Sequence, residues 1–214
     1  MSPWPHDDTA SKNAFYGDFH SPGWQALNLV HMLAPYALYY DKQLLAHGIL
    51  VHKKTVDALT AVFAEIWTNC NQDQAQVDKI GMSDFGGCFN IRNISGSNNW
   101  SNHSWAIASD WAPSTNGFNT GHGSMSQIAI NAFKRQGALW GGDYHGRTDP
   151  MHFEFVSRSG EDNVDYYGQS YRRRRGVAIG ELASDVLPRS TPGRCANGPR
   201  RVACGDHRVG HAEH

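Results

Sequence analysis

The sequence is poor in cysteine, has no long apolar run and carries almost no net charge. Its four cysteines, at positions 70, 88, 195 and 204 of 214 residues, are too few and too scattered for a disulfide scaffold, which favours synthesis in a reducing cytosol. Every apolar run is shorter than the roughly 20 residues that span a bilayer, so we expect no membrane span. The formal charge of -1 provides no general attraction to nucleic acid or to a membrane surface.

The N-terminus also lacks the basic and apolar regions of a secretory signal, so we expect the chain to be made in the cytoplasm. The hydrophobic content of 40% is enough for one sizeable core. We divide the chain into an irregular N-terminal arm (1–23), one domain (24–184) and a tail or linker rich in proline and glycine (185–214).

Apolar periodicity predicts a helix over residues 53–69 and another over 124–136, the second capped by Ser124 and ended near Gly137. A shorter helical pattern covers 24–33. Strands are expected at residues 36–40, 49–51, 89–92, 105–109, 139–144 and 151–156. Short strands between helices predict an α+β domain in which a small, mostly antiparallel sheet is flanked by helices.

Two segments contain the residue types of a hydrolytic zinc site, which needs three nitrogen or oxygen ligands, an open position and a nearby carboxylate. In the first segment, His103 and Asp110 are separated by about 23 Å on a straight strand or about 10 Å on a helix, and neither distance allows one shared metal. The backbone must therefore bend between them, which small residues such as Ser104 and Ala106 permit.

In the second segment, Asp149 and His152 lie on either side of Pro150, and a turn entering a strand would bring both to one cleft. Strand alternation would then direct Phe153 to the core and Glu154 to the side of His152. Glu154 is therefore either a partner of the ligands or a rival acid. A single histidine in such a stretch is more often a hydrogen-bonded structural residue than a ligand, so the combination carries the inference.

These segments resemble the metallopeptidase family of D-alanyl-D-alanine carboxypeptidases and dipeptidases and of phage L-alanyl-D-glutamate endolysins, which share a hedgehog-like fold. The family motif SxHxxGxAxD reads here as Ser101, His103, Ala106, Ala108 and Asp110, and its later [DE]xxH element reads as Asp149 and His152. The resemblance spans about residues 25–156. Three further segments add to the resemblance. Residues 140–144 are similar to an aromatic and glycine stretch of the family, and residues 51–54 and 89–92 are similar to its phage branch.

One departure from the family pattern is Ala106, which replaces the glycine of the motif. Alanine restricts positive φ, so the ligand loop would be strained or shifted if this position needs a left-handed conformation.

The resemblance implies that His103, Asp110 and His152 bind Zn²⁺ and that Asp149 is the general base, which takes a proton from the attacking water and returns it to the leaving amine. Arg92 would bind the oxyanion or a substrate carboxylate, with a surface salt bridge as the alternative. Ser101 would steady the loop or contact substrate, and His145 is a further candidate for substrate binding.

The expected function is a phage-type endopeptidase that hydrolyses a bond in peptidoglycan stem peptides, such as L-alanyl-D-glutamate, or a cross-bridge bond. Absence of a signal suits an endolysin that waits in the cytoplasm and reaches the wall once the membrane is opened. The alternatives are a bacterial D-alanyl-D-alanine carboxypeptidase of the same family and a non-catalytic wall-binding module that retains the zinc site.

The C-terminal part contains two further patterns. The basic run Arg172–Arg175 suits anionic wall polymers; it lacks the interleaved recognition residues of a nucleic-acid site, so we expect no nucleic-acid partner. The spacing of Cys195, Cys204, His207 and His211 is not that of a common zinc module and favours a solvated tail. The sequence does not indicate an oligomeric state.

Overall fold

The longest helix follows the apolar periodicity of its sequence. In the computed structural model, which describes residues 2–158, a 3-10 turn η1 (Lys53–Thr55) leads into helix α3 (Val56–Asn69). The side chains of Leu59, Val62 and Phe63, which lie on the predicted apolar stripe, are buried. The helix predicted over residues 53–69 is therefore confirmed, and core packing is sufficient to explain its sequence.

The central sheet has four short strands in the order β5–β6–β8–β7, all paired antiparallel. The strands are β5 (Phe85–Gly87), β6 (Ala108–Trp111), β7 (Leu139–Trp140) and β8 (His152–Glu154). Asp110 on β6 lies directly opposite His152 on β8. This register brings the two predicted metal-binding segments together at the middle of the sheet.

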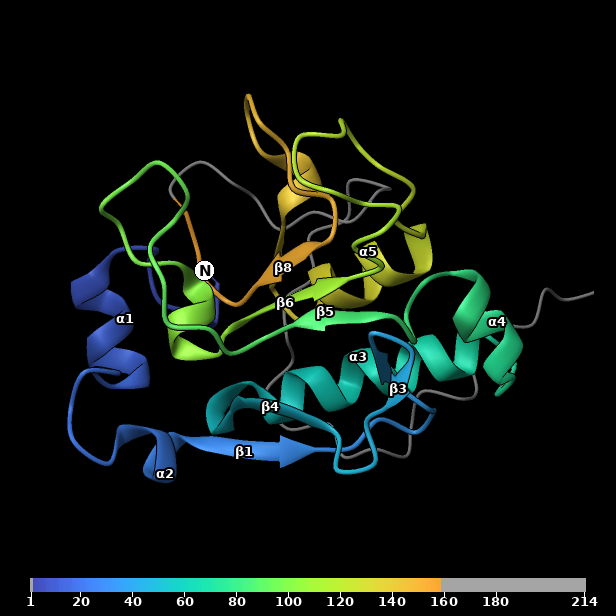
Figure 1. Cartoon of the computed structure of the whole chain (residues 1–214), viewed down its shortest axis with the longest axis horizontal. Helices are drawn as coiled ribbons and strands as arrows, with labels where there is room; N and C mark the ends of the chain where they lie inside the picture. Colours follow the sequence, from blue (N-terminus) through green and yellow to red (C-terminus); the bar gives the residue numbers. More distant parts are fainter. Residues whose placement is uncertain (1, 159–214) are drawn as a thin grey trace, which may run out of the picture. The chain divides into compact units, whose positions relative to one another are not determined.

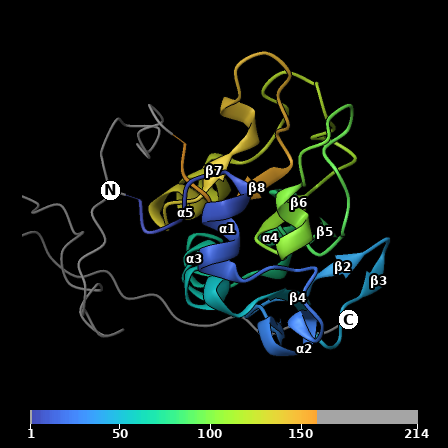
Figure 2. The same cartoon turned by 90° about the vertical axis from the view of Figure 1, so that its left-hand side faces the viewer.

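Helices α3 and α5 (Gln127–Arg135) cover one face of this sheet, as the two views in Figures 1 and 2 show. Phe133 of α5 stacks on Phe153 of β8 with ring centroids 4.0 Å apart, and Phe63 of α3 packs against Trp111 of β6 at 5.7 Å. Because side chains alternate along a strand, Asp110 and the neighbours of Phe153 point to the opposite face. One face of the sheet therefore packs into the apolar core, and the other face carries polar side chains.

Two small antiparallel pairs complete the fold. β1 (Leu29–Met32) pairs with β4 (Ile49–His52), and β2 (Tyr39–Tyr40) forms a hairpin with β3 (Gln43–Leu44). The remaining elements are α1 (Thr9–Tyr16), α2 (Trp24–Asn28), α4 (Gln74–Lys79), η2 (Asn102–Trp105) and η3 (Gly141–Asp143). The predicted α+β class with a small antiparallel sheet is confirmed.

The N-terminal segment differs from the irregular arm predicted for residues 1–23. It contains α1, which Asp8 caps by accepting a hydrogen bond from the backbone N–H of Ser11, and Tyr16 at the end of this helix is 1% exposed. The short helix has little periodicity of its own, so it forms because its aromatic end packs into the core. Trp4 and Phe19 are buried as well.

Several predicted boundaries were also wrong. The strand expected at 89–92 does not form; the strand in this part of the chain is β5 (Phe85–Gly87), which contains Gly86 and Gly87 at a register shift. β6 begins only at Ala108, since 3-10 turn η2 occupies part of the expected strand, and α5 begins at Gln127 because Ser126, not Ser124, accepts the capping hydrogen bond. Turns and caps were misplaced, whereas the periodic core segments were found.

Among the described residues, none of the helices combines the length and apolar character that crossing a bilayer requires. The predicted tail at 185–214, the run Arg172–Arg175 and the cysteines and histidines near the C-terminus lie outside the described residues.

Replacing Tyr16 with Phe tests the anchoring of α1. The Tyr16 hydroxyl donates a 2.6 Å hydrogen bond to the buried carbonyl of Phe155, and its loss leaves that acceptor unpaired. We expect a loss of about 1–2 kcal/mol in the free energy of unfolding, measured by urea denaturation. The matched change Tyr40→Phe, at a side chain that is 52% exposed, should have almost no effect. Equal stability of the two variants would contradict the anchoring role of α1.

Candidate metal centre

The 3-10 turn η2 supplies the first predicted ligand, His103. Ser101 caps this turn, because its hydroxyl accepts from the His103 backbone N–H at 3.4 Å and its carbonyl accepts from Ser104 at 2.9 Å. The turn ends at Ala106, whose backbone is left-handed with φ 54° and ψ 40°. The chain then enters β6. This turn is the bend that a shared metal site requires between His103 and Asp110.

Ala106 therefore occupies the conformation that the family glycine would favour. A left-handed alanine costs roughly 1–2 kcal/mol relative to the right-handed region. Its N–H donates to the His103 carbonyl at 3.0 Å and its own carbonyl accepts from His52 at 3.0 Å, so both sides of the residue are held. The expected strain is present, and the ligand loop still closes.

The side chains of His103, Asp110 and His152 converge, as the sequence predicted. Nε2 of His103 lies 3.2 Å from Nδ1 of His152, and the two carboxylate oxygens of Asp110 lie 3.3 Å from the first and 2.9 Å from the second of these nitrogens. The three ligand atoms all lie within 4.8 Å of one another. One imidazole nitrogen from each ring and one carboxylate oxygen can thus face a single cation.

Hydrogen bonds on the far side of each ring decide which nitrogen is available. Nδ1 of His103 donates to the Cys88 carbonyl at 2.8 Å, which leaves Nε2 with its lone pair toward the centre. Nε2 of His152 faces the Glu154 carboxylate at 3.4 Å, which leaves Nδ1 for the centre. Outer partners of this kind fix the tautomer and orientation of metal-binding histidines.

The charges around the centre favour a cation. Burial alone would lower the pKa of His152, but hydrogen bonds to Asp110 and Glu154 outweigh it and raise this pKa to about 10. For Asp110, burial opposes ionisation, yet hydrogen bonds from His103 and His152 hold the pKa of its carboxyl below the usual range. A site that holds a proton this firmly is also suited to a metal ion.

Asp149 lies beside this centre with a free carboxylate oxygen. Its Oδ1 atom is buried and has no hydrogen-bond partner among the described residues, and burial raises the pKa of its carboxyl. The Asp149 N–H donates to the carbonyl of Gly141 at 2.8 Å, an approach that only glycine permits, since a Cβ at Gly141 would lie 2.3 Å from the Asp149 carbonyl oxygen. A buried, unpaired oxygen of this kind fits a water molecule or a metal-bound group.

Glu154 belongs to a buried network that the sequence did not reveal. Its carboxylate accepts hydrogen bonds from the side chains of Asn102 (2.6 Å) and Tyr144 (2.5 Å) and forms an ion pair with Arg158 at 2.6 Å. Burial opposes ionisation of Glu154, but His152 and Arg158 keep its pKa well below the usual range. Glu154 is thus a partner of His152. Strand alternation indicated its side of the sheet, while its partners come from segments without any recognisable motif.

The N-terminal segment extends this network. Asp7 accepts from both Arg158 (2.7 Å) and the buried ammonium of Lys12 (2.9 Å), which in turn donates to Asn102 at 2.7 Å. Residues expected to form an irregular arm therefore support the outer partners of the candidate ligands.

Three other predicted site residues do not enter the centre. The Arg92 guanidinium is exposed and donates to the neighbouring Asn93 carbonyl at 3.5 Å, and it makes no hydrogen bond or ion pair with the ligands in the described part of the chain. Its backbone carbonyl instead accepts from Ser101 at 3.0 Å. Ser101 is buried as the cap of η2, and His145 is exposed. Their roles toward substrate stay predictions.

Comparison with known proteins agrees with this geometry. Residues 95–155 match the family model described as D-alanyl-D-alanine carboxypeptidase, a stretch that contains all three ligands and Asp149. The match supports a peptidase that acts on peptidoglycan in general, and members of the matching family are generally zinc-dependent. No curated protein and no solved structure gives a significant match, so the hedgehog-like fold stays a prediction.

Changing Glu154 to Gln should weaken zinc binding by about 10- to 100-fold, because the neutral amide no longer supports the basicity of His152. Competition with a chromophoric zinc chelator measures the affinity. Glu65→Gln is the matched control, since Glu65 pairs with Arg135 on the helical side of the fold. If the Glu154 variant and the wild type bound zinc equally well, Glu154 would not be needed to orient His152 for metal binding.

Zinc binding should release about one proton per ion at pH 7, because His152, with its pKa near 10, carries a proton that the metal must displace. Below that pKa the proton competes with zinc, so affinity should rise as the pH increases toward it. Titration calorimetry in two buffers of different ionisation enthalpy counts the protons. A count of zero would show that His152 is neutral before the metal binds.

Proposed function

We propose that this chain is a zinc-dependent endopeptidase of the phage endolysin type, which hydrolyses a stem-peptide bond of peptidoglycan such as L-alanyl-D-glutamate, or a cross-bridge bond. The observation that carries the proposal is the convergence of His103, Asp110 and His152 beside the unpartnered oxygen of Asp149. Three ligands with a separate carboxylate are the composition of a hydrolytic zinc site, whereas structural sites use four protein ligands.

The donor set fits zinc, which accepts imidazole nitrogen and carboxylate oxygen in tetrahedral sites. When bound, zinc supplies Lewis acidity, which polarises the scissile carbonyl and makes water nucleophilic near neutral pH. Asp110 contributes the negative charge that holds the cation, and the two histidines are fixed by Cys88 and Glu154.

Asp149 carries the proton transfers. Its buried oxygen accepts a proton from the attacking water, and the raised pKa of its carboxyl makes it a stronger base than an exposed aspartate. The same group then donates this proton to the leaving amine as the peptide bond breaks. The turn that leads into β8 holds Asp149 beside the ligands, since the His152 N–H donates to the Asp149 carbonyl at 3.0 Å.

A D-alanyl-D-alanine carboxypeptidase is the second candidate, because the matching family model has that description. The non-catalytic wall-binding module rested on Ala106 alone. That support is weakened, since Ala106 adopts the left-handed conformation and the ligands still converge. The proposal also includes the place of action: the protein would reach the cell wall after release from the cytoplasm. The run Arg172–Arg175 would be attracted to anionic wall polymers.

The two enzymatic candidates differ in the bond that they break. We would incubate the zinc-loaded protein with purified sacculi and with free peptides ending in D-alanyl-D-alanine, and analyse the products by mass spectrometry. New amino termini inside the stem or cross-bridge support the endopeptidase. Release of free D-alanine alone would replace it with the carboxypeptidase, and the absence of any product would contradict both.

Asp149→Asn and His152→Ala separate catalysis from metal binding in this assay. The first variant should retain zinc and lose hydrolysis by several orders of magnitude, since only the proton-transferring group is neutralised. The second should lose zinc. An unchanged rate for Asp149→Asn, or stoichiometric zinc in His152→Ala by elemental analysis, would contradict the assigned roles.

A further inference from the structure

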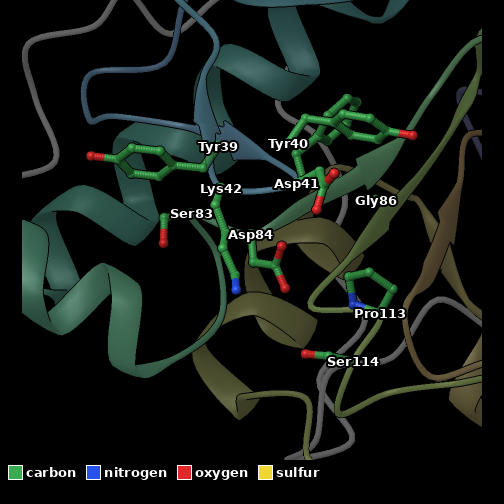
Figure 3. Close-up of a pocket in the computed structure, with 10 residues that line it drawn as sticks. Tyr39, Tyr40, Asp41, Lys42, Ser83, Asp84, Gly86, Pro113 and Ser114 are labelled. Carbon is green, nitrogen blue, oxygen red and sulfur yellow. The ribbon is translucent and has the colours of Figure 1, made fainter.

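A cavity of about 660 Å³ lies between the β2–β3 hairpin, the start of β5 and the segment after β6 (Figure 3). The two turn residues of the hairpin, Asp41 and Lys42, both have positive φ, at 47° and 64°. Aspartate is common in such turns, whereas a lysine with positive φ is unusual. A strained residue of this kind at the mouth of a cavity is compatible with a binding role.

The cavity adjoins β5, an edge strand of the central sheet. Its wall includes Gly86 of β5, and a Cβ built on this glycine would lie 3.0 Å from the Cβ of the metal ligand Asp110 and 3.3 Å from Cγ of Pro113, another wall residue. Asp110 therefore packs directly on Gly86. The cavity wall thus reaches the residue of β5 that contacts Asp110, while His103, Asp110 and His152 do not line the cavity.

The lining combines aromatic rings with opposite charges. Tyr39 and Tyr40 lie on opposite sides of the hairpin, and Lys42 and Asp84 extend toward the same space (Figure 3). Tyr40 lines the cavity and is 52% exposed, so it is accessible to a ligand. Two carboxylates, from Asp41 and Asp84, against one ammonium create no strong field of a single sign, which does not suit a highly charged polymer.

We propose that this cavity binds the amino-sugar strand of peptidoglycan, which would hold the substrate while its stem peptide reaches the metal. The ring of Tyr40 can pack against the apolar C–H face of a pyranose, carboxylates accept hydrogen bonds from sugar hydroxyls, and an ammonium donates to acetamido oxygens. The volume lies within the range of about 300–1,000 Å³ that is typical of small-molecule sites, and it suits one or two sugar units.

This inference rests on the proposed function and narrows it. In peptidoglycan the stem peptide is joined to the sugar by its first residue, so a sugar held beside β5 would leave the beginning of the stem nearer to Asp110 than the end of the stem. The L-alanyl-D-glutamate bond is near the beginning, whereas a terminal D-alanyl-D-alanine bond is at the end. Recognition of the sugar therefore favours the endopeptidase.

The test measures binding without hydrolysis. We would titrate zinc-loaded wild type, Tyr40→Ala, Tyr40→Phe and Leu44→Ala with the peptide-free disaccharide of N-acetylglucosamine and N-acetylmuramic acid, using calorimetry. Tyr40→Ala should weaken binding by about tenfold or more, since the stacking surface is lost, whereas Tyr40→Phe should keep most of it. Leu44 is exposed on the same hairpin and is not part of the cavity wall, so Leu44→Ala should bind normally.

Failure of the disaccharide to bind the wild type, or equal affinity of Tyr40→Ala and the wild type, would overturn the proposal. Binding of a sugar-free stem peptide to the cavity, without binding of the disaccharide, would also overturn the proposal, because the occupant would then be a peptide. The probe contains no peptide bond to the stem. An inactive protein that binds it would contradict only the proposed function, and an active peptidase that does not bind it would contradict only this inference.

Discussion

The site depends on one cross-strand pairing, Asp110 on β6 opposite His152 on β8. The carboxylate contacts both imidazoles, and without a cation the two rings and the acid hold a proton between them. Three polar groups this close and this buried are unfavourable unless charge and hydrogen bonds are balanced. The sheet brings the three residues together in an arrangement that could hold a cation.

The balance of charge extends beyond the ligands to the first residues of the chain. Glu154 orients His152. Arg158 balances the charge of Glu154, and Asn102 donates a hydrogen bond to it. Asp7 in turn contacts both Arg158 and the buried Lys12. In a buried network each unpaired member would cost more than any single pair contributes, so its members act together. The N-terminal segment is therefore a structural support of the centre, which gives its burial a functional reason.

Backbone strain gathers around the same strand. β6 is preceded by Ala106 and followed by Ala112, both left-handed, with φ of 54° and 46°. Ala112 is held by a 2.8 Å hydrogen bond from its N–H to the Asp84 carbonyl, next to the cavity wall. Strain of this kind persists only where surrounding contacts compensate for it, and here it turns the chain sharply at both ends of the strand that carries Asp110.

The sequence by itself predicted the core helices and the α+β class, because apolar periodicity is a local property. Its resemblance to a metallopeptidase family singled out His103, Asp110, His152 and Asp149, and the first three of these converge in the structure. The sequence did not determine the cap at Ser126, the strand at Gly86 or helix α1, since each depends on packing against distant residues. Only the tertiary structure decided how the chain bends between His103 and Asp110, which partners surround Glu154, and that a cavity lined by tyrosines adjoins β5. These are contacts between segments far apart in the chain, and no local pattern encodes them.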